Sequence, residues 1–194
     1  MSGRRQLIRL AAIVLFSFGM GIVNALMRVD GSNLFSSLSQ AVAPWLLLAF
    51  LAGAFANEHR LRIGAFSGLA ATMAALIGFY FTNGAIFHYG PQSWPGYLTY
   101  GFGQGKVFFT LGLLSGPSLG AFGAWWRQNL SLVPVLTVGM LFIIEGLTHA
   151  SQTNFFAPDA TQVAAIEVLL GLVWIAVALV TTRSWRQRVD VHTT

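Results

Sequence analysis

Six apolar stretches, each close to the length of a membrane-crossing helix, limit what this chain can fold into. A helix needs about 20 mainly apolar residues to cross ~30 Å of hydrocarbon. The composition agrees, because 55% of the residues are hydrophobic and 9% are charged, too few polar groups to cover a water-soluble fold. The sequence therefore predicts an all-α, polytopic membrane helix bundle that forms a single transmembrane domain over residues 1–194. The six transmembrane helices are expected at about 7–27, 39–56, 63–82, 107–126, 130–149 and 162–182.

The positions of the basic residues orient this bundle. If the N-terminus is cytoplasmic, the outer side holds only Arg28 and Lys106, and the inner side holds nine arginines: Arg4, Arg5, Arg9, Arg60, Arg62, Arg127, Arg183, Arg186 and Arg188. This is the positive-inside bias for an even number of spans, so both termini are expected in the cytoplasm of a multi-pass inner (plasma) membrane protein. Orientation and lipid headgroups account for the net charge of +5, so we expect the lipid bilayer as a partner and no nucleic acid.

Small residues recur every fourth position in two of the expected spans. The rows are Gly112, Gly116, Gly120 and Ala124 in the fourth span, and Ser17, Gly21 and Ala25 in the first. Such rows let two helix backbones approach closely. We expect them to pack helices of the same chain together. The alternative is that the row on the first span docks a partner membrane subunit or a second copy of the chain.

Two carboxylates interrupt the apolar spans at matching depth. Glu145 lies about five residues, or ~7 Å, outward from the middle of the fifth span, and Glu167 on the sixth reaches nearly the same level. His149 stands one turn above Glu145 on the same face, and Asn24 lies slightly higher on the first span. An ionised carboxylate facing lipid costs about 2.5–3.5 kcal/mol near the helix centre, so these groups are expected to line a polar cavity open to the outside. The alternative is structural, with Glu145 paired to Lys106 or Arg28.

The expected outer connection, residues 83–106, is rich in aromatic side chains. Trp94 and Tyr97 are expected to form a wall or lid above the carboxylates that stacks on a planar or hydrophobic solute, with Lys106 beside them. The alternative is an interfacial aromatic belt.

Several kinds of chemistry are disfavoured by what the sequence lacks. There is no cysteine, which excludes disulfides, thiolate nucleophiles and cysteine-based zinc sites. No nucleophile and base share a common depth, so we expect neither an enzyme nor a cofactor. Zinc ligation by Glu145, His149 and Glu167 is considered and not favoured, because no helix carries two histidines at metal-ligand spacing. We therefore predict no metal site.

Three segments carry a resemblance to known families: APWLLLAFLAGAFA (43–56), GAFSGLAATMAALIGFY (64–80) and SGPSLGAFGAWWR (115–127). They resemble segments of small bacterial integral membrane proteins grouped as a domain of unknown function, which implies no activity. The architecture also resembles the substrate-binding S components of energy-coupling-factor vitamin transporters. That resemblance implies six helices, a first helix that docks a transmembrane partner, and an outward-facing site. The Ala-x-x-x-Ala signature of that first helix is replaced here by Ser17, Gly21 and Ala25.

These observations favour a small-solute transport or solute-binding membrane protein with a polar site in the outer half of the bundle. The residues expected to bind a small-molecule ligand on the outer side are Glu145, Glu167, His149, Asn24, Trp94, Tyr97 and Lys106. The first alternative is a non-catalytic membrane subunit or assembly factor whose polar layer is structural. A membrane enzyme is the third.

Overall fold

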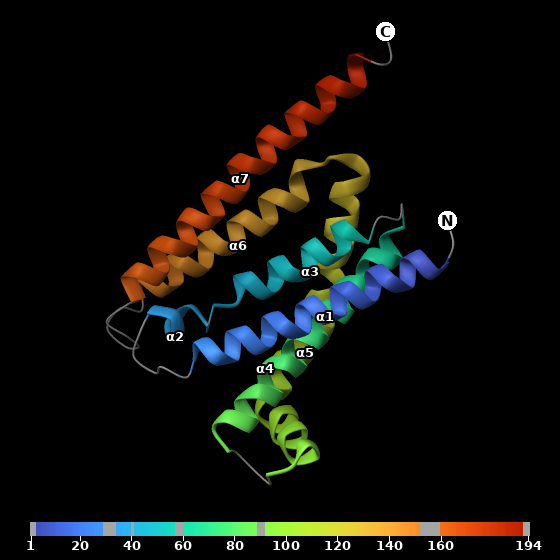
Figure 1. Ribbon diagram of the computed structural model, residues 1–194. Coiled ribbons are helices and arrows are strands. Elements are labelled where there is room, and N and C mark those ends of the chain that lie inside the picture. Colours follow the sequence, from blue (N-terminus) through green and yellow to red (C-terminus); the bar gives the residue numbers. More distant parts are fainter. Residues whose placement is uncertain are drawn as a thin grey trace.

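The described part of the chain is entirely helical (Figure 1), as the sequence predicts. The computed structural model describes residues 3–28, 34–39, 41–56, 60–88, 92–151 and 160–191. Its helices are α1 (Gly3–Met27), α2 (Leu34–Leu38), α3 (Ala43–Phe55), α4 (Leu61–Ile86), α5 (Trp94–Asn129), α6 (Leu132–Ser151) and α7 (Ala160–Val191). Five segments are long and apolar enough to cross a membrane: Gln6–Met27, Leu61–Ile86, Trp94–Asn129, Leu132–Ser151 and Thr161–Thr182.

The expected span at 39–56 is not a membrane-length helix. Helix α3 has 13 residues, or ~20 Å at 1.5 Å per residue, and the short α2 precedes it with non-helical backbone at 41–42 between them. Pro44 explains where α3 begins. Proline lacks an amide hydrogen and its ring clashes with the carbonyl four residues earlier, so it belongs in the first turn of a helix and not in its interior.

Helix α5 is longer than expected, because it begins at Trp94 and takes in half of the predicted outer connection at 83–106. Ser93 caps it by accepting a hydrogen bond from the amide of Gly96 at 3.2 Å, and Pro95 occupies the first turn. Serine followed by an early proline is a helix start signal. Gly101 and Gly105 of this segment lie against the Tyr80 side chain of α4.

Glycines set the distance between α3, α4 and α5. A Cβ atom on Gly120 would lie 2.8 Å from the Cα atom of Gly68 and would collide with the carbonyl oxygen of Gly64. On another side of the same helix turn, Gly53 of α3 meets the backbone of Gly120. The row on α5 thus packs helices of the same chain, as expected.

The row on α1 is also used inside the chain. Ser17, Gly21 and Ala25 are all buried, and a Cβ atom on Gly21 would lie 2.8 Å from the amide nitrogen of Phe79 on α4. Helix α4 covers this row within the chain, and docking of a partner subunit on it stays a prediction.

Helix α3 joins two helical hairpins, α4–α5 and α6–α7 (Figure 1), and the C-terminal part of α7 extends beyond α6. Phe50 of α3 is fully buried, and its ring lies 5.8 Å from that of Trp126 on α5 and 5.8 Å from that of Trp174 on α7. The indole of Trp174 donates a hydrogen bond to the carbonyl oxygen of Val135 on α6 at 3.1 Å. The Phe50 contacts hold the middle of α3 against α5 and α7, about two turns beyond the start of α3, which lies at the carboxylate of Glu145.

Candidate functional site

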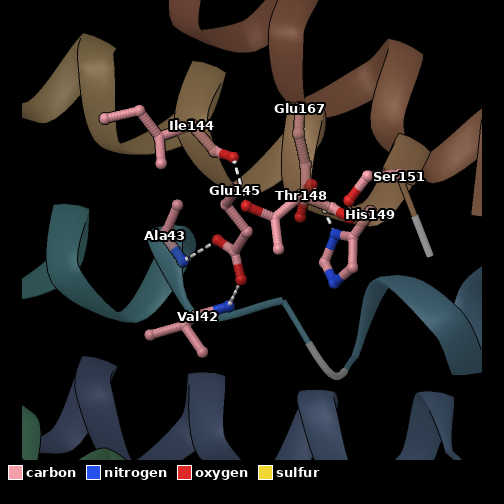
Figure 2. A network of polar contacts seen from close by, with 8 residues as sticks. All are labelled: Val42, Ala43, Ile144, Glu145, Thr148, His149, Ser151 and Glu167. Atoms are coloured by element: carbon pink, nitrogen blue, oxygen red, sulfur yellow. Dashed lines mark hydrogen bonds and ion pairs between the residues drawn. The ribbon is translucent and has the colours of Figure 1, made fainter.

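Glu145 caps the N-terminus of α3. Figure 2 shows its carboxylate pointing from α6 at the first turn of α3, where Oε1 accepts a hydrogen bond from the amide of Val42 at 2.6 Å and Oε2 accepts one from the amide of Ala43 at 2.5 Å. The partners of this carboxylate are therefore backbone amides, and not Lys106 or Arg28 as the structural alternative supposed.

The start of α3 explains why a carboxylate occupies an otherwise apolar helix. The first amides of a helix lack acceptors within it, and the helix dipole concentrates positive charge there. Pro44 contributes no amide hydrogen, and the amide of Trp45 is satisfied by the carbonyl oxygen of Val42 at 3.0 Å. The two amides that remain are the two that Glu145 accepts from. The positive N-terminal end of α3 therefore balances the negative charge of the Glu145 carboxylate.

Glu167 is the most deeply buried charged group of the site. Its Oε2 lies 2.7 Å from Nδ1 of His149, and the two side chains are 2% and 29% exposed. The other oxygen, Oε1, is buried and has no hydrogen-bond partner among the described residues. A buried carboxylate oxygen without a partner is costly, because the lost hydration is not replaced.

Gly146 lets α7 come close enough for this contact. A Cβ atom at Gly146 would lie 2.8 Å from the carbonyl oxygen of Ala164 and 3.2 Å from the Cβ atom of Glu167. The residue beside Glu145 therefore has to be glycine for α6 and α7 to pack at this distance.

We expect Gly146→Ala to push α7 outward and to break the contact between His149 and Glu167. The variant should therefore have a lower melting temperature in detergent than the wild type.

Three of the predicted site residues come together in space. Glu145, His149 and Glu167 each offer one metal-ligand atom, and these atoms lie within 4.8 Å of one another. The common depth of the three residues, and the shared face of Glu145 and His149, were predicted from the sequence. The convergence of the three ligand atoms was not, because zinc was not favoured without a second histidine on one helix.

The remaining predicted residues lie apart from this cluster. Asn24 is on α1, which packs mainly on α4, and its Oδ1 is buried without a partner among the described residues. Tyr97 packs on Phe81 of α4 with ring centroids 6.0 Å apart, and Trp94 and Lys106 are exposed on α5. No described contact joins any of them to Glu145, and the aromatic wall above the carboxylates stays a prediction.

The first turn of α3 is the part of the site that the sequence analysis missed. The amides of Val42 and Ala43 contribute backbone groups, which no side-chain pattern reveals. Pro44 was the available signal, because a proline inside an apolar stretch marks a helix start or a kink.

The part of the chain that the structure describes is built from helices. Five of them are long and apolar enough to cross a membrane, and a histidine–carboxylate cluster lies between α6, α7 and the start of the shorter α3. The chain belongs to a family of unknown function, DUF6518, whose sequence profile matches residues 1–194. No curated protein and no solved structure matches the chain. Nothing in these comparisons supports the resemblance to the S components of energy-coupling-factor transporters.

Proposed function

We propose that this protein binds a small positively charged solute in the outer half of the membrane, as a solute-binding or transport protein. One observation carries the proposal: Glu167 has a buried carboxylate whose Oε1 has no partner among the described residues. Ionisable groups inside membrane helices are expensive, and they mark ligand or ion pathways more often than not. A cationic ligand would give Oε1 the partner that it lacks.

The charges around Glu167 favour a cation over an anion. Glu145 and Glu167 bring two carboxylates into one cluster, and His149 is the basic side chain that lies on them. Two neighbouring carboxylates repel each other unless a proton or a cation lies between them. His149 is partly exposed, at 29% of its side chain, and offers the route by which a solute reaches the buried carboxylate.

The packing of α3 supports the six-span topology with both termini in the cytoplasm. One groove is lined by residues from the start of α1, the end of α3 and the start of α4, among them Arg9, Ala56 and Ser67. The first residues of α3 meet Glu145 near the end of α6. Helix α3 therefore runs back toward the N-terminal end of α1. We propose that the α2–α3 segment makes the sixth crossing, although α3 alone is shorter than a membrane span. An even number of crossings returns the chain to the side on which it began.

The absence of cysteine makes this topology directly testable. Gln92 and Asn129 are exposed positions just before the start and at the end of α5. In intact cells, we expect Gln92→Cys to react with a membrane-impermeant thiol reagent, and Asn129→Cys to react only after permeabilisation. Labelling of Asn129→Cys in intact cells would overturn the proposed topology.

Glu167→Gln tests the proposed function. The amide keeps the shape of the side chain and can still contact His149, and an uncharged group is cheaper to hold in a membrane helix. We expect the variant to be as stable as the wild type or more stable. We also expect native mass spectrometry to show a small cationic adduct on the wild type and none on the variant. A clear drop in melting temperature with the adduct retained would show that Glu167 is structural.

A second candidate, a non-catalytic membrane subunit or assembly factor, is favoured by one observation. Both oxygens of Glu145 accept hydrogen bonds from the start of α3. Capping of α3 is therefore enough to explain why Glu145 is present, without a ligand. Under this candidate, gently solubilised wild-type protein carries no small-molecule adduct and co-purifies with other membrane subunits.

A further inference from the structure

We propose that Glu145, His149 and Glu167 form a binding site for a divalent transition-metal ion such as Zn²⁺, clamped between α6, α7 and the start of α3. The proposal rests on the proposed function and names the class of its cation. The three side chains offer ligand atoms that lie within 4.8 Å of one another. Metal–ligand bonds of about 2.0–2.2 Å at tetrahedral angles place ligand atoms roughly 3.3–3.6 Å apart, so closing the site takes combined side-chain movements of about 1–1.5 Å.

The donor set suits such an ion. One imidazole nitrogen and two carboxylates are ligands that zinc and its neighbours accept, whereas Ca²⁺ and Mg²⁺ take oxygen ligands in greater number. Two carboxylates supply the negative charge that a dication neutralises. The hydrogen bonds from Val42 and Ala43 leave Glu145 able to ligate, because an ionised carboxylate has about four lone-pair sites and α3 uses two.

A second observation points to a ligand at the same place. Glu167 is 1% exposed, and one oxygen of its carboxylate already lies against His149. The other oxygen of that same carboxylate is buried and has no partner among the described residues. A metal ion in the cluster would be coordinated by that oxygen. The amides of α3 would then hold Glu145 in place from outside the metal, as hydrogen-bond donors to ligating carboxylates commonly do.

A bound ion would also link three helices and so stabilise the fold. Glu145 comes from α6, Glu167 from α7, and the capped amides from α3 (Figure 2). A metal bound by the first two residues would tie α6 to α7 and, through Glu145, to α3. Binding to the folded state alone raises stability with ligand concentration, so Zn²⁺ is expected to raise the melting temperature of the wild-type protein.

The experiment is a titration of the purified, chelator-treated full-length protein in detergent with Co²⁺, followed by visible absorption and by competition with Zn²⁺. We expect one ion per chain. Glu167→Gln and His149→Gln should each weaken binding by more than the about 10–100-fold typical of losing an outer-sphere partner. His88→Gln is the matched control, because His88 is an exposed histidine beyond the end of α4, and it should bind as the wild type does. No stoichiometric binding, or equal binding by Glu167→Gln and the wild type, would overturn the site.

A measurement on the unmutated protein keeps the test decisive if a variant does not fold. Diethyl pyrocarbonate modifies accessible histidines, and peptide mass spectrometry reports His149 and His88 separately. Zn²⁺ should protect His149 and leave His88 reactive. Equal modification of His149 with and without Zn²⁺ overturns the metal site. If native mass spectrometry of that same protein still shows an organic cationic adduct that Glu167→Gln loses, the proposed function stands and only the metal is wrong. If neither ligand is found, both fail.

Discussion

Replacing Gly120 by alanine is expected to lower the free energy of unfolding by about 3 kcal/mol, at the upper end of the range for overpacked sites. The added Cβ atom would lie 2.8 Å from the Cα atom and 2.9 Å from the amide nitrogen of Gly68. These are backbone atoms, so no side-chain rotation relieves the clash, and α4 and α5 have to separate. Thermal unfolding in detergent measures the effect, which corresponds to a drop on the order of 10 °C.

Gly103→Ala on the same helix is the matched control. A Cβ atom at Gly103 meets no atom within 4 Å, and alanine is favoured over glycine in a helix by about 0.8–1 kcal/mol. The control should therefore match or exceed the stability of the wild type. Equal stability of Gly120→Ala and Gly103→Ala would mean that α4 and α5 do not approach each other as described.

Glu145→Ala is expected to cost about 3 kcal/mol, because it leaves two helix-start amides without acceptors, and an unsatisfied backbone group in a bilayer costs several kcal/mol. Removing the charge offsets part of this cost. The offset is small, because the carboxylate lies at the positive end of α3. Glu145→Gln keeps one acceptor oxygen and should lose about half as much stability. The order of melting temperatures is therefore wild type, then glutamine, then alanine.

Comparing the two glutamates separates their roles. Both are single carboxylates near the same depth, yet Glu145 has a partner on each oxygen and Glu167 has one unsatisfied oxygen. The glutamine variant should be destabilised at position 145 and not at position 167. A more stable Glu145→Gln would contradict the cap.

The sequence predicts those parts of the fold that follow from hydropathy and spacing. Long apolar runs gave the five membrane-length helices, and rows of small residues four apart identified the faces on which α1 and α5 pack. Hydropathy failed at the N-terminal ends of α3 and α5, where a proline lies in the first turn. Pro44 shortens α3, and Ser93 with Pro95 starts α5 early. Both are local helix-start effects, and a count of apolar residues does not register them.

The candidate site likewise has features that the sequence predicts and features that it does not. Depth and the four-residue spacing placed Glu145, His149 and Glu167 together before any coordinates, because those quantities depend on a straight helix alone. The rotation of α7 against α6 depends on the contact at Gly146, and the role of Glu145 depends on backbone amides of another segment. Neither is visible in a side-chain pattern. Asn24, Trp94, Tyr97 and Lys106 were grouped with the cluster because they were expected near the outer ends of the spans, although they belong to α1 and α5.

The cap on α3 joins residues that are far apart in the order of synthesis. The amides of Val42 and Ala43 precede their acceptor Glu145 by 103 and 102 positions. At about 5–20 residues per second, a ribosome needs roughly 5–20 s to extend the chain from one partner to the other. During that interval the start of α3 has no carboxylate to receive its amides. We therefore expect the amides before Pro44 to be hydrogen-bonded by the translocon, lipid headgroups or water until α6 is synthesised. Only then can the start of α3 be buried in the bilayer.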